Sequence, residues 1–100
     1  MSASCVVIVN GKTAGESEVE AALERLATLE SAEVRVTEQD GDAFRFAREA
    51  ARASVDRVIA FGGDGTLNAV VSGLVAYGGP GPFSGALGIV PTGTGRGDGG

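Results

Sequence analysis

Two glycine-rich segments each follow a short apolar run, and their residue types suit the binding of phosphate. Residues 62–66 read GGDGT and residues 91–95 read PTGTG. Glycine lets backbone N–H groups approach a ligand because no Cβ stands in the way. A helix that begins after the first segment would direct free N–H groups and the positive end of its dipole at the same place. The first segment therefore predicts an anion site suited to phosphate.

Asp64 lies inside the first segment, beside Thr66, whose hydroxyl can donate a hydrogen bond there. A carboxylate beside a phosphate repels it unless a cation lies between them, and Mg²⁺ held through water is the natural partner. The alternative is an ordinary strand-to-helix turn with Asp64 near the helix cap. The segment matches neither the phosphate-binding pattern GxxxxGKS/T nor the dinucleotide pattern GxGxxG.

Apolar runs of strand length alternate with segments of helical periodicity. We expect strands at residues 5–9, 34–37, 57–61 and 86–90, and helices from residue 17 onward, over residues 43–53 and over residues 66–77. The order βαβαβαβ predicts an α/β fold with three layers and a mostly parallel sheet joined by right-handed connections. Ligands gather at the carboxyl ends of the strands in such sheets. There both glycine-rich segments would meet Asn10, Gly11, Lys12 and Thr37.

The predicted helices have distinct apolar and polar sides. The buried side of the first helix follows the spacing i, i+3, i+4 and i+7, with Val19, Ala22, Leu23 and Leu26. Ser17 and Glu20 fit a capping box at its start. Asp42 is the candidate cap of the second helix, and the residues expected on its buried side are Phe44, Ala47 and Ala51. We expect its other faces to be solvated, with Arg45, Arg48, Glu49 and Arg52.

Composition excludes several classes of function. The 100 residues allow one domain, and a net charge of −5 gives no general attraction to nucleic acid or anionic membranes. Because histidine is absent, Ser-His-Asp and Cys-His pairs and His-containing metal motifs are excluded. The single cysteine, Cys5, excludes an internal disulfide. The run at residues 5–9 is far shorter than the roughly 18 residues of a membrane span, so we expect a soluble, cytoplasmic protein with Cys5 buried.

Residues 62–68, GGDGTLN, resemble the signature of the diacylglycerol kinase catalytic family, which includes sphingosine kinases and bacterial YegS-type lipid kinases. Other blocks are similar to the YegS type in the same order, at residues 9–12, 34–37 with 41–43, and 87–94. The resemblance covers nearly the whole chain. It implies that residues 1–100 are the N-terminal nucleotide-binding domain of a lipid kinase fold, truncated at its C-terminal end and lacking the second, mainly β domain.

The resemblance implies ATP and Mg²⁺ as cofactors and transfer of the γ-phosphoryl group to a lipid hydroxyl of a diacylglycerol-like or phosphatidylglycerol-like acceptor. Asp64 would be the catalytic residue, in a magnesium–water network without a direct metal ligand in this chain. The residues that would hold the phosphates are Gly62, Gly63, Asp64, Gly65, Thr66, Leu67, Asn68 and Ala69. The nucleotide would also meet Asn10, Gly11, Lys12, Thr37, Gly93 and Thr94.

The sequence departs from the family at Ala69, where a glutamate is usual, and at Arg96 and Gly97, where an Asn-Asp pair is usual. The resemblance assigns much of the lipid pocket, further magnesium ligands and the general base to the missing domain. We therefore expect the 100-residue chain to be inactive alone, to reach lipid only through that domain and to make at most peripheral membrane contact. Two alternatives stay open: a non-catalytic nucleotide-binding remnant and a relative of the NAD kinases, which share GGDGT.

Overall fold

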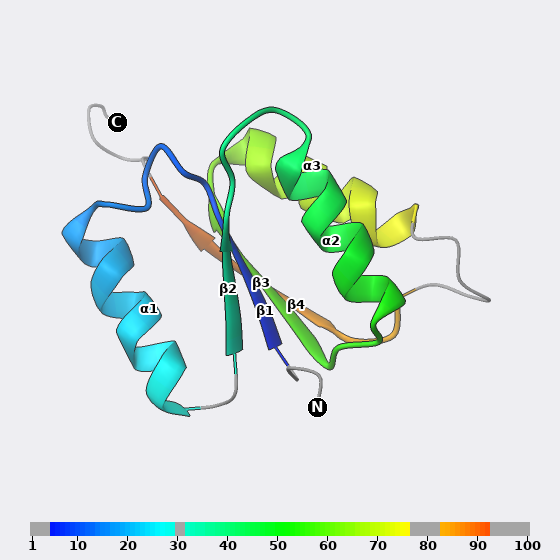
Figure 1. Ribbon diagram of the computed structural model, residues 1–100, viewed down its shortest axis with the longest axis horizontal. Helices are drawn as coiled ribbons and strands as arrows, with labels where there is room; N and C mark the ends of the chain where they lie inside the picture. The colour runs from blue at the N-terminus through cyan, green and yellow to red at the C-terminus, as the bar shows by residue number, and fades with distance from the viewer. Residues whose placement is uncertain (1–4, 30–31, 77–82, 93–100) are drawn as a thin grey trace.

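The computed structural model describes residues 5–29, 32–76 and 83–92, where four parallel strands alternate with three helices (Figure 1). The elements are β1 (Cys5–Val9), α1 (Ser17–Leu29), β2 (Ala32–Val36), α2 (Asp42–Arg52), β3 (Arg57–Gly62), α3 (Asp64–Val75) and β4 (Ala86–Pro91). The predicted α/β class and element order are confirmed. Among the described helices, none is long and apolar enough to cross a membrane.

The strands lie in the order β2-β1-β3-β4, so the chain changes direction across the sheet after β2. Right-handed connections then place α1 on one face and both α2 and α3 on the other (Figure 1). Strands β1 and β3 are neighbours in the sheet. Because of the change of direction, the connections that leave these two strands run toward opposite edges of the sheet. A crevice for ligands is expected outside the carboxyl ends of such a strand pair.

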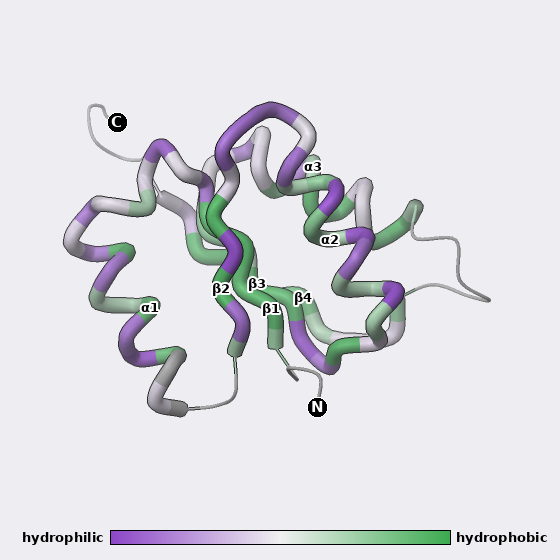
Figure 2. Tube along the Cα trace, in the orientation of Figure 1, coloured by the Kyte–Doolittle hydropathy of each residue, from purple (hydrophilic) through white to green (hydrophobic). Residues whose placement is uncertain are grey.

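The inner strand β1, which is hydrophobic in Figure 2, is buried along its whole length. This confirms the expected burial of Cys5. The side chains of β1 alternate between the two faces, as strand geometry requires. Val6 and Ile8 pack in the core beneath α2 and α3, whereas Cys5, Val7 and Val9 pack in the core beneath α1. Val7 is paired with Val34 of β2 on one side and with Ile59 of β3 on the other.

Helix α2 packs closely against α3 at Gly73. A Cβ at Gly73 would meet the backbone oxygen of Phe44 and would lie 2.9 Å from the Cβ of Ala47. The buried stripe of α2 contains Ala43, Phe46, Ala47, Ala50 and Ala51. The prediction that Phe44 is buried is therefore wrong in part, because the helical phase places Phe46 in the core and leaves Phe44 only half-buried.

The polar side of α2 follows the prediction at Arg45, Glu49 and Arg52, which are exposed. Arg48 differs, because it is half-buried. Its Nε atom is buried and has no hydrogen-bond partner among the described residues. Its guanidinium carbon lies 5.9 Å from the centre of the Phe44 ring. Part of a side chain expected to be solvated is thus buried.

Helix α1 covers its face of the sheet through Val19, which is buried, and through partly buried Ala22, Leu23 and Leu26. This confirms the predicted apolar side. The proposed capping box is wrong in register, because the N–H of Glu20 donates to the carbonyl oxygen of Glu16 at 2.9 Å. That bond gives Glu16 the N-cap position and makes Ser17 the first helical residue.

Candidate nucleotide site

The segments that follow the strands meet at one edge of the sheet. Asn10 N donates to the carbonyl oxygen of Phe61 at 2.9 Å, and Thr37 N donates to that of Val9 at 2.9 Å. On the far side, Thr92 N donates to the carbonyl oxygen of Gly62 at 3.2 Å. The parallel ladder therefore continues past the ends of the strands and holds their following segments in register.

Side chains join these segments across long distances in the sequence. Asn10 Nδ2 donates to Thr66 Oγ1 at 3.0 Å, while Asn10 Oδ1 accepts from the Lys12 N–H at 2.8 Å. The N–H of Gly11 donates to Thr37 Oγ1 at 3.0 Å. Asn10 thus connects the segment after β1 to α3, and Thr37 connects it to the segment after β2.

A cavity of about 710 Å³ opens at this edge, which is a volume typical of small-molecule sites. Seven of the residues predicted from the sequence line it, namely Asn10, Gly11, Lys12, Thr37, Gly65, Thr66 and Ala69. The lining residues that sequence reasoning missed are Val36, Glu38, Gln39, Asp40, Gly41 and Ala43. Two signals were available, because these residues flank the predicted Thr37 and because residues 41–43 belong to one of the blocks similar to the YegS type.

Helix α3 starts two residues earlier than predicted, at Asp64 rather than Thr66. The N–H of Leu67 donates to the carbonyl oxygen of Gly63 at 3.0 Å, which gives Gly63 the N-cap position. The N–H groups of Asp64, Gly65 and Thr66 consequently have no partner within the helix. Because Gly65 and Thr66 line the cavity, the positive end of the α3 dipole lies beside it.

Glycine occupies the positions around the start of α3 for different reasons. A Cβ at Gly62 would lie 2.6 Å from the Cβ of Thr66, so only glycine fits beneath that side chain. A Cβ at Gly65 would meet no atom within 4 Å. Packing therefore explains Gly62 but not Gly65, whose open side is next to the cavity.

Five other predicted residues are described by the structure and do not line the cavity. Asp64 and Asn68 are exposed on α3, Leu67 and Gly63 are half-buried, and Gly62 is buried at the end of β3. Gly93 and Thr94 lie outside the described residues. In the part of the chain that the structure describes, no cluster of three or more His, Cys, Asp or Glu residues could hold a metal ion.

The segment at residues 37–41 forms the cavity wall opposite α3; we call it the β2–α2 wall. Gly41 has a φ of +92°, a left-handed conformation that favours glycine. The wall carries the exposed carboxylates of Glu38 and Asp40, whereas Lys12 contributes a positive charge to the cavity lining. The two sides of the cavity thus differ in charge.

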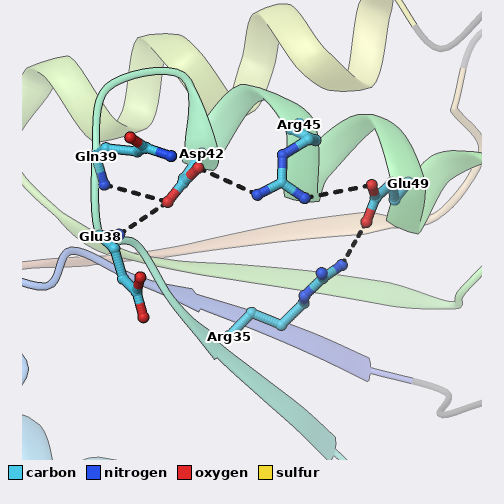
Figure 3. A network of polar contacts seen from close by, with 6 residues as sticks. All are labelled: Arg35, Glu38, Gln39, Asp42, Arg45 and Glu49. Atoms are coloured by element: carbon cyan, nitrogen blue, oxygen red, sulfur yellow. Dashed lines mark hydrogen bonds and ion pairs between the residues drawn. The ribbon is translucent and has the colours of Figure 1, made fainter.

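Asp42 adjoins this wall and was predicted as the helix cap, which is wrong. Gly41 occupies the N-cap position, and Asp42 is the first helical residue. Its Oδ2 atom accepts from the N–H groups of Glu38 at 2.9 Å and Gln39 at 3.2 Å, which precede the helix (Figure 3). The Glu38 N–H is the main cause that holds the pKa of Asp42 below its usual value, with help from Gln39 and Arg45 and against the effect of burial.

Comparisons with known proteins identify the family. Residues 4–97 match the family model of the diacylglycerol kinase catalytic domain. The chain belongs to this family. This confirms the resemblance drawn from the glycine-rich segments, and the match includes all four similar blocks.

Curated relatives in the diacylglycerol kinase catalytic family are longer than this chain. A "Probable lipid kinase YegS-like" from Serratia proteamaculans is 43% identical over 93 residues, which are 92% of this chain and 30% of that protein. Its namesake from Yersinia enterocolitica is 45% identical over 93 residues, with 89% and 30% covered. A crystal structure of a diacylglycerol kinase from Bacillus anthracis is 29% identical, with a TM-score of 0.69 over 95% of this chain and 35% of the other.

Proposed function

We propose that this domain binds ATP in the cavity at the carboxyl edge of the sheet, with the phosphates at the start of α3. The observation that carries the proposal is the open side of Gly65, where a Cβ would meet no atom within 4 Å. A phosphate could approach the backbone there, within reach of N–H groups that lack helical partners. Membership of a kinase family supports a nucleotide as the phosphate-bearing ligand.

The polar residues of the cavity would act on the ligand through defined atoms. Thr66 Oγ1 accepts a hydrogen bond from Asn10 Nδ2, which leaves the hydroxyl proton of Thr66 for a phosphate oxygen. Asn10 already uses both side-chain atoms within the protein, so it positions Thr66 and the Lys12 segment. Lys12 would add positive charge beside the phosphates.

Bound Mg²⁺ would neutralise phosphate charge during transfer. The donor set fits a cation held mainly by phosphate oxygens and water, because Asp64 is an exposed carboxylate in the first turn of α3. In this proposal Asp64 would bind a water molecule of the cation's shell.

The complete reaction in our proposal is transfer of the γ-phosphoryl group to the hydroxyl of a diacylglycerol-like or phosphatidylglycerol-like lipid. The chain spans about 30% of its curated relatives, so acceptor binding is assigned to sequence that the relatives have beyond the matched region. This coverage favours a second candidate, which is nucleotide binding without turnover by the 100-residue chain.

Calorimetric titration with Mg-ATP tests the binding site through Gly65→Ala. The methyl group would occupy the open side of Gly65, so we expect affinity to fall by about tenfold or more, equivalent to a loss of at least ~1.4 kcal/mol. Stability should stay equal or rise, because alanine is the better helix former and has room. Gly15→Ala is the matched control, since Gly15 also has nothing within 4 Å and does not line the cavity.

Each outcome of the titration has a definite meaning. Unchanged affinity in Gly65→Ala would show that the phosphates do not lie at Gly65. No heat of binding with millimolar Mg-ATP would remove nucleotide binding altogether. Binding without phosphorylation of diacylglycerol or phosphatidylglycerol vesicles would favour the second candidate for this chain.

A further inference from the structure

The β2–α2 wall is exposed at most of its residues, yet it is attached to a buried carboxylate. Glu38, Gln39, Asp40 and Gly41 are all exposed, whereas Asp42 is only 6% exposed. A segment of this kind would ordinarily sample many conformations, at a cost in conformational entropy when a ligand orders it. We propose that Asp42 is a positioning residue that holds the β2–α2 wall in its binding shape before the nucleotide arrives.

The contacts of Asp42 reach both the wall and the helix behind it. Oδ2 accepts from two successive N–H groups of the wall, those of Glu38 and Gln39, and Oδ1 accepts from Arg45 Nη2 at 3.1 Å. In return, the N–H of Asp42 donates to the carbonyl oxygen of Gln39 at 3.2 Å. The wall is thus closed into a compact turn against the first turn of α2.

A chain of ion pairs extends this attachment to the strand on the other side of the wall. Arg45 Nη1 lies 3.6 Å from Glu49 Oε2, and Arg35 Nη1 donates to Glu49 Oε1 at 2.6 Å (Figure 3). Both guanidinium groups also lie over the ring of Phe46, with their central carbons 4.1 Å and 4.8 Å from its centre. The wall therefore has β2 on one side and α2 on the other, joined by one network that ends at Asp42.

A carboxylate suits this position better than an amide. Three donors converge on Asp42, and its two oxygen atoms can accept all of them. An asparagine has one oxygen and one NH₂ group, so it must turn a donor either toward the wall N–H groups or toward Arg45. Asp42→Asn therefore keeps the shape of the side chain while it removes at least one of the attachments.

The inference rests on the proposed function, and titration of the Asp42→Asn variant with Mg-ATP tests it. We expect affinity to fall by about tenfold, because the wall must be ordered during binding. Asp56→Asn is the matched control, because Asp56 is exposed directly before β3, does not line the cavity, and the change in charge is the same. Leu74→Ala is the second control, because it weakens the core without touching the wall and should bind like the wild type when folded.

Amide hydrogen exchange supplies a readout that general destabilisation would not reproduce. In the free wild-type chain the amides of Glu38 and Gln39 should be protected, and Asp42→Asn should lose that protection while the amides of β1 keep theirs. Equal affinities of Asp42→Asn and wild type would overturn the inference, as would unprotected wall amides in the wild type. Arg45→Met leaves the wall N–H bonds in place and should weaken binding by about two- to threefold. This variant replaces Asp42→Asn in the titration if Asp42→Asn does not fold.

The outcomes also separate this inference from the proposed function. If the wild type does not bind Mg-ATP, the proposed function fails and the role of Asp42 in nucleotide binding fails with it. If the wild type binds and Gly65→Ala weakens binding while Asp42→Asn does not, only the role of Asp42 is overturned.

Discussion

The two faces of the sheet are covered very differently. Beneath α2 and α3, the described residues form a core of twelve buried members, from Val6 to Leu74. Beneath α1, the corresponding core has five buried members among the described side chains, and Val19 is the one of these that comes from the helix. Figure 1 shows the same contrast, with two helices side by side on one face and α1 alone on the other.

The cavity lies on the densely covered face. Its lining includes Ala43 of α2 and Ala69 of α3, and both residues pack in or against the larger core. Both helices of this face therefore contribute to the lining of the cavity. Helix α1 contributes no lining residue among those described.

A pair of leucine truncations tests this contrast with the largest expected effect. Leu74→Ala on α3 should lower the free energy of unfolding by about 3 kcal/mol, because a buried side chain leaves a cavity. Leu26→Ala on α1 should cost only about 1 kcal/mol, since this side chain is already partly exposed. Urea unfolding would measure both, and equal losses would contradict the unequal packing of the two faces.

The contact between α2 and α3 can be tested at Gly73. Gly73→Ala should cost about 2 kcal/mol, because the methyl group would meet the backbone oxygen of Phe44 and force the helices apart. Gly65→Ala in the same helix is the control, since its methyl group has open space. Thermal unfolding of both variants is the measurement. A Gly73→Ala variant as stable as Gly65→Ala would show that the helices are not tightly fitted.

The loss of folding stability at acid pH is the smallest expected effect, and it should arise mainly from the carboxylates of α2. Hydrogen bonding from Arg35 is the main cause that lowers the pKa of Glu49, and the wall N–H of Glu38 is the main cause for Asp42. A lowered folded-state pKa stabilises the fold above the unfolded value, near pH 4, and this stabilisation is lost as the pH falls through the folded value. The exposed Glu49 pair should contribute less than about 1 kcal/mol.

Denaturant unfolding at pH 6 and pH 3 would measure this effect. The wild type should lose more stability between the two pH values than the double variant Asp42→Asn with Glu49→Gln. An identical loss in the two proteins would place the acid-sensitive groups elsewhere and would break the proposed link to α2.

The sequence was sufficient to predict the helices, the strands and about half of the residues that line the cavity. Apolar periodicity reveals the elements, and the carboxyl ends of parallel strands meet at one edge of the sheet. Phe44 and Phe46 show where local pattern stops being sufficient. They are two residues apart, and only the contacts of α2 with the sheet and α3 decide which one is buried. Similarly, two adjacent glycines suggested a loop through Gly65, but the helix starts at Asp64.

The β2–α2 wall could not be predicted for a different reason. Aspartate before a helical run commonly caps the helix, and nothing in the sequence shows that Asp42 instead turns back to Glu38 and Gln39. That choice depends on Gly41 with its φ of +92° and on the position of Arg45. The wall is thus a product of several neighbouring contacts, each of which is weak evidence alone.

The central place of β1 has a consequence for synthesis on the ribosome. Among the four strands of the sheet, β1 is made before the others, and β3, one of its two neighbours, is complete only at Gly62. The bond between Asn10 and Thr66 joins residues 56 positions apart, so it cannot form until α3 has begun to emerge. Such distant pairings slow folding, and the newly made β1 keeps an unpaired apolar edge meanwhile. A nascent chain that stops before Thr66 would contain Lys12 and Thr37 but would lack most of α3, at whose start we propose that the phosphates bind.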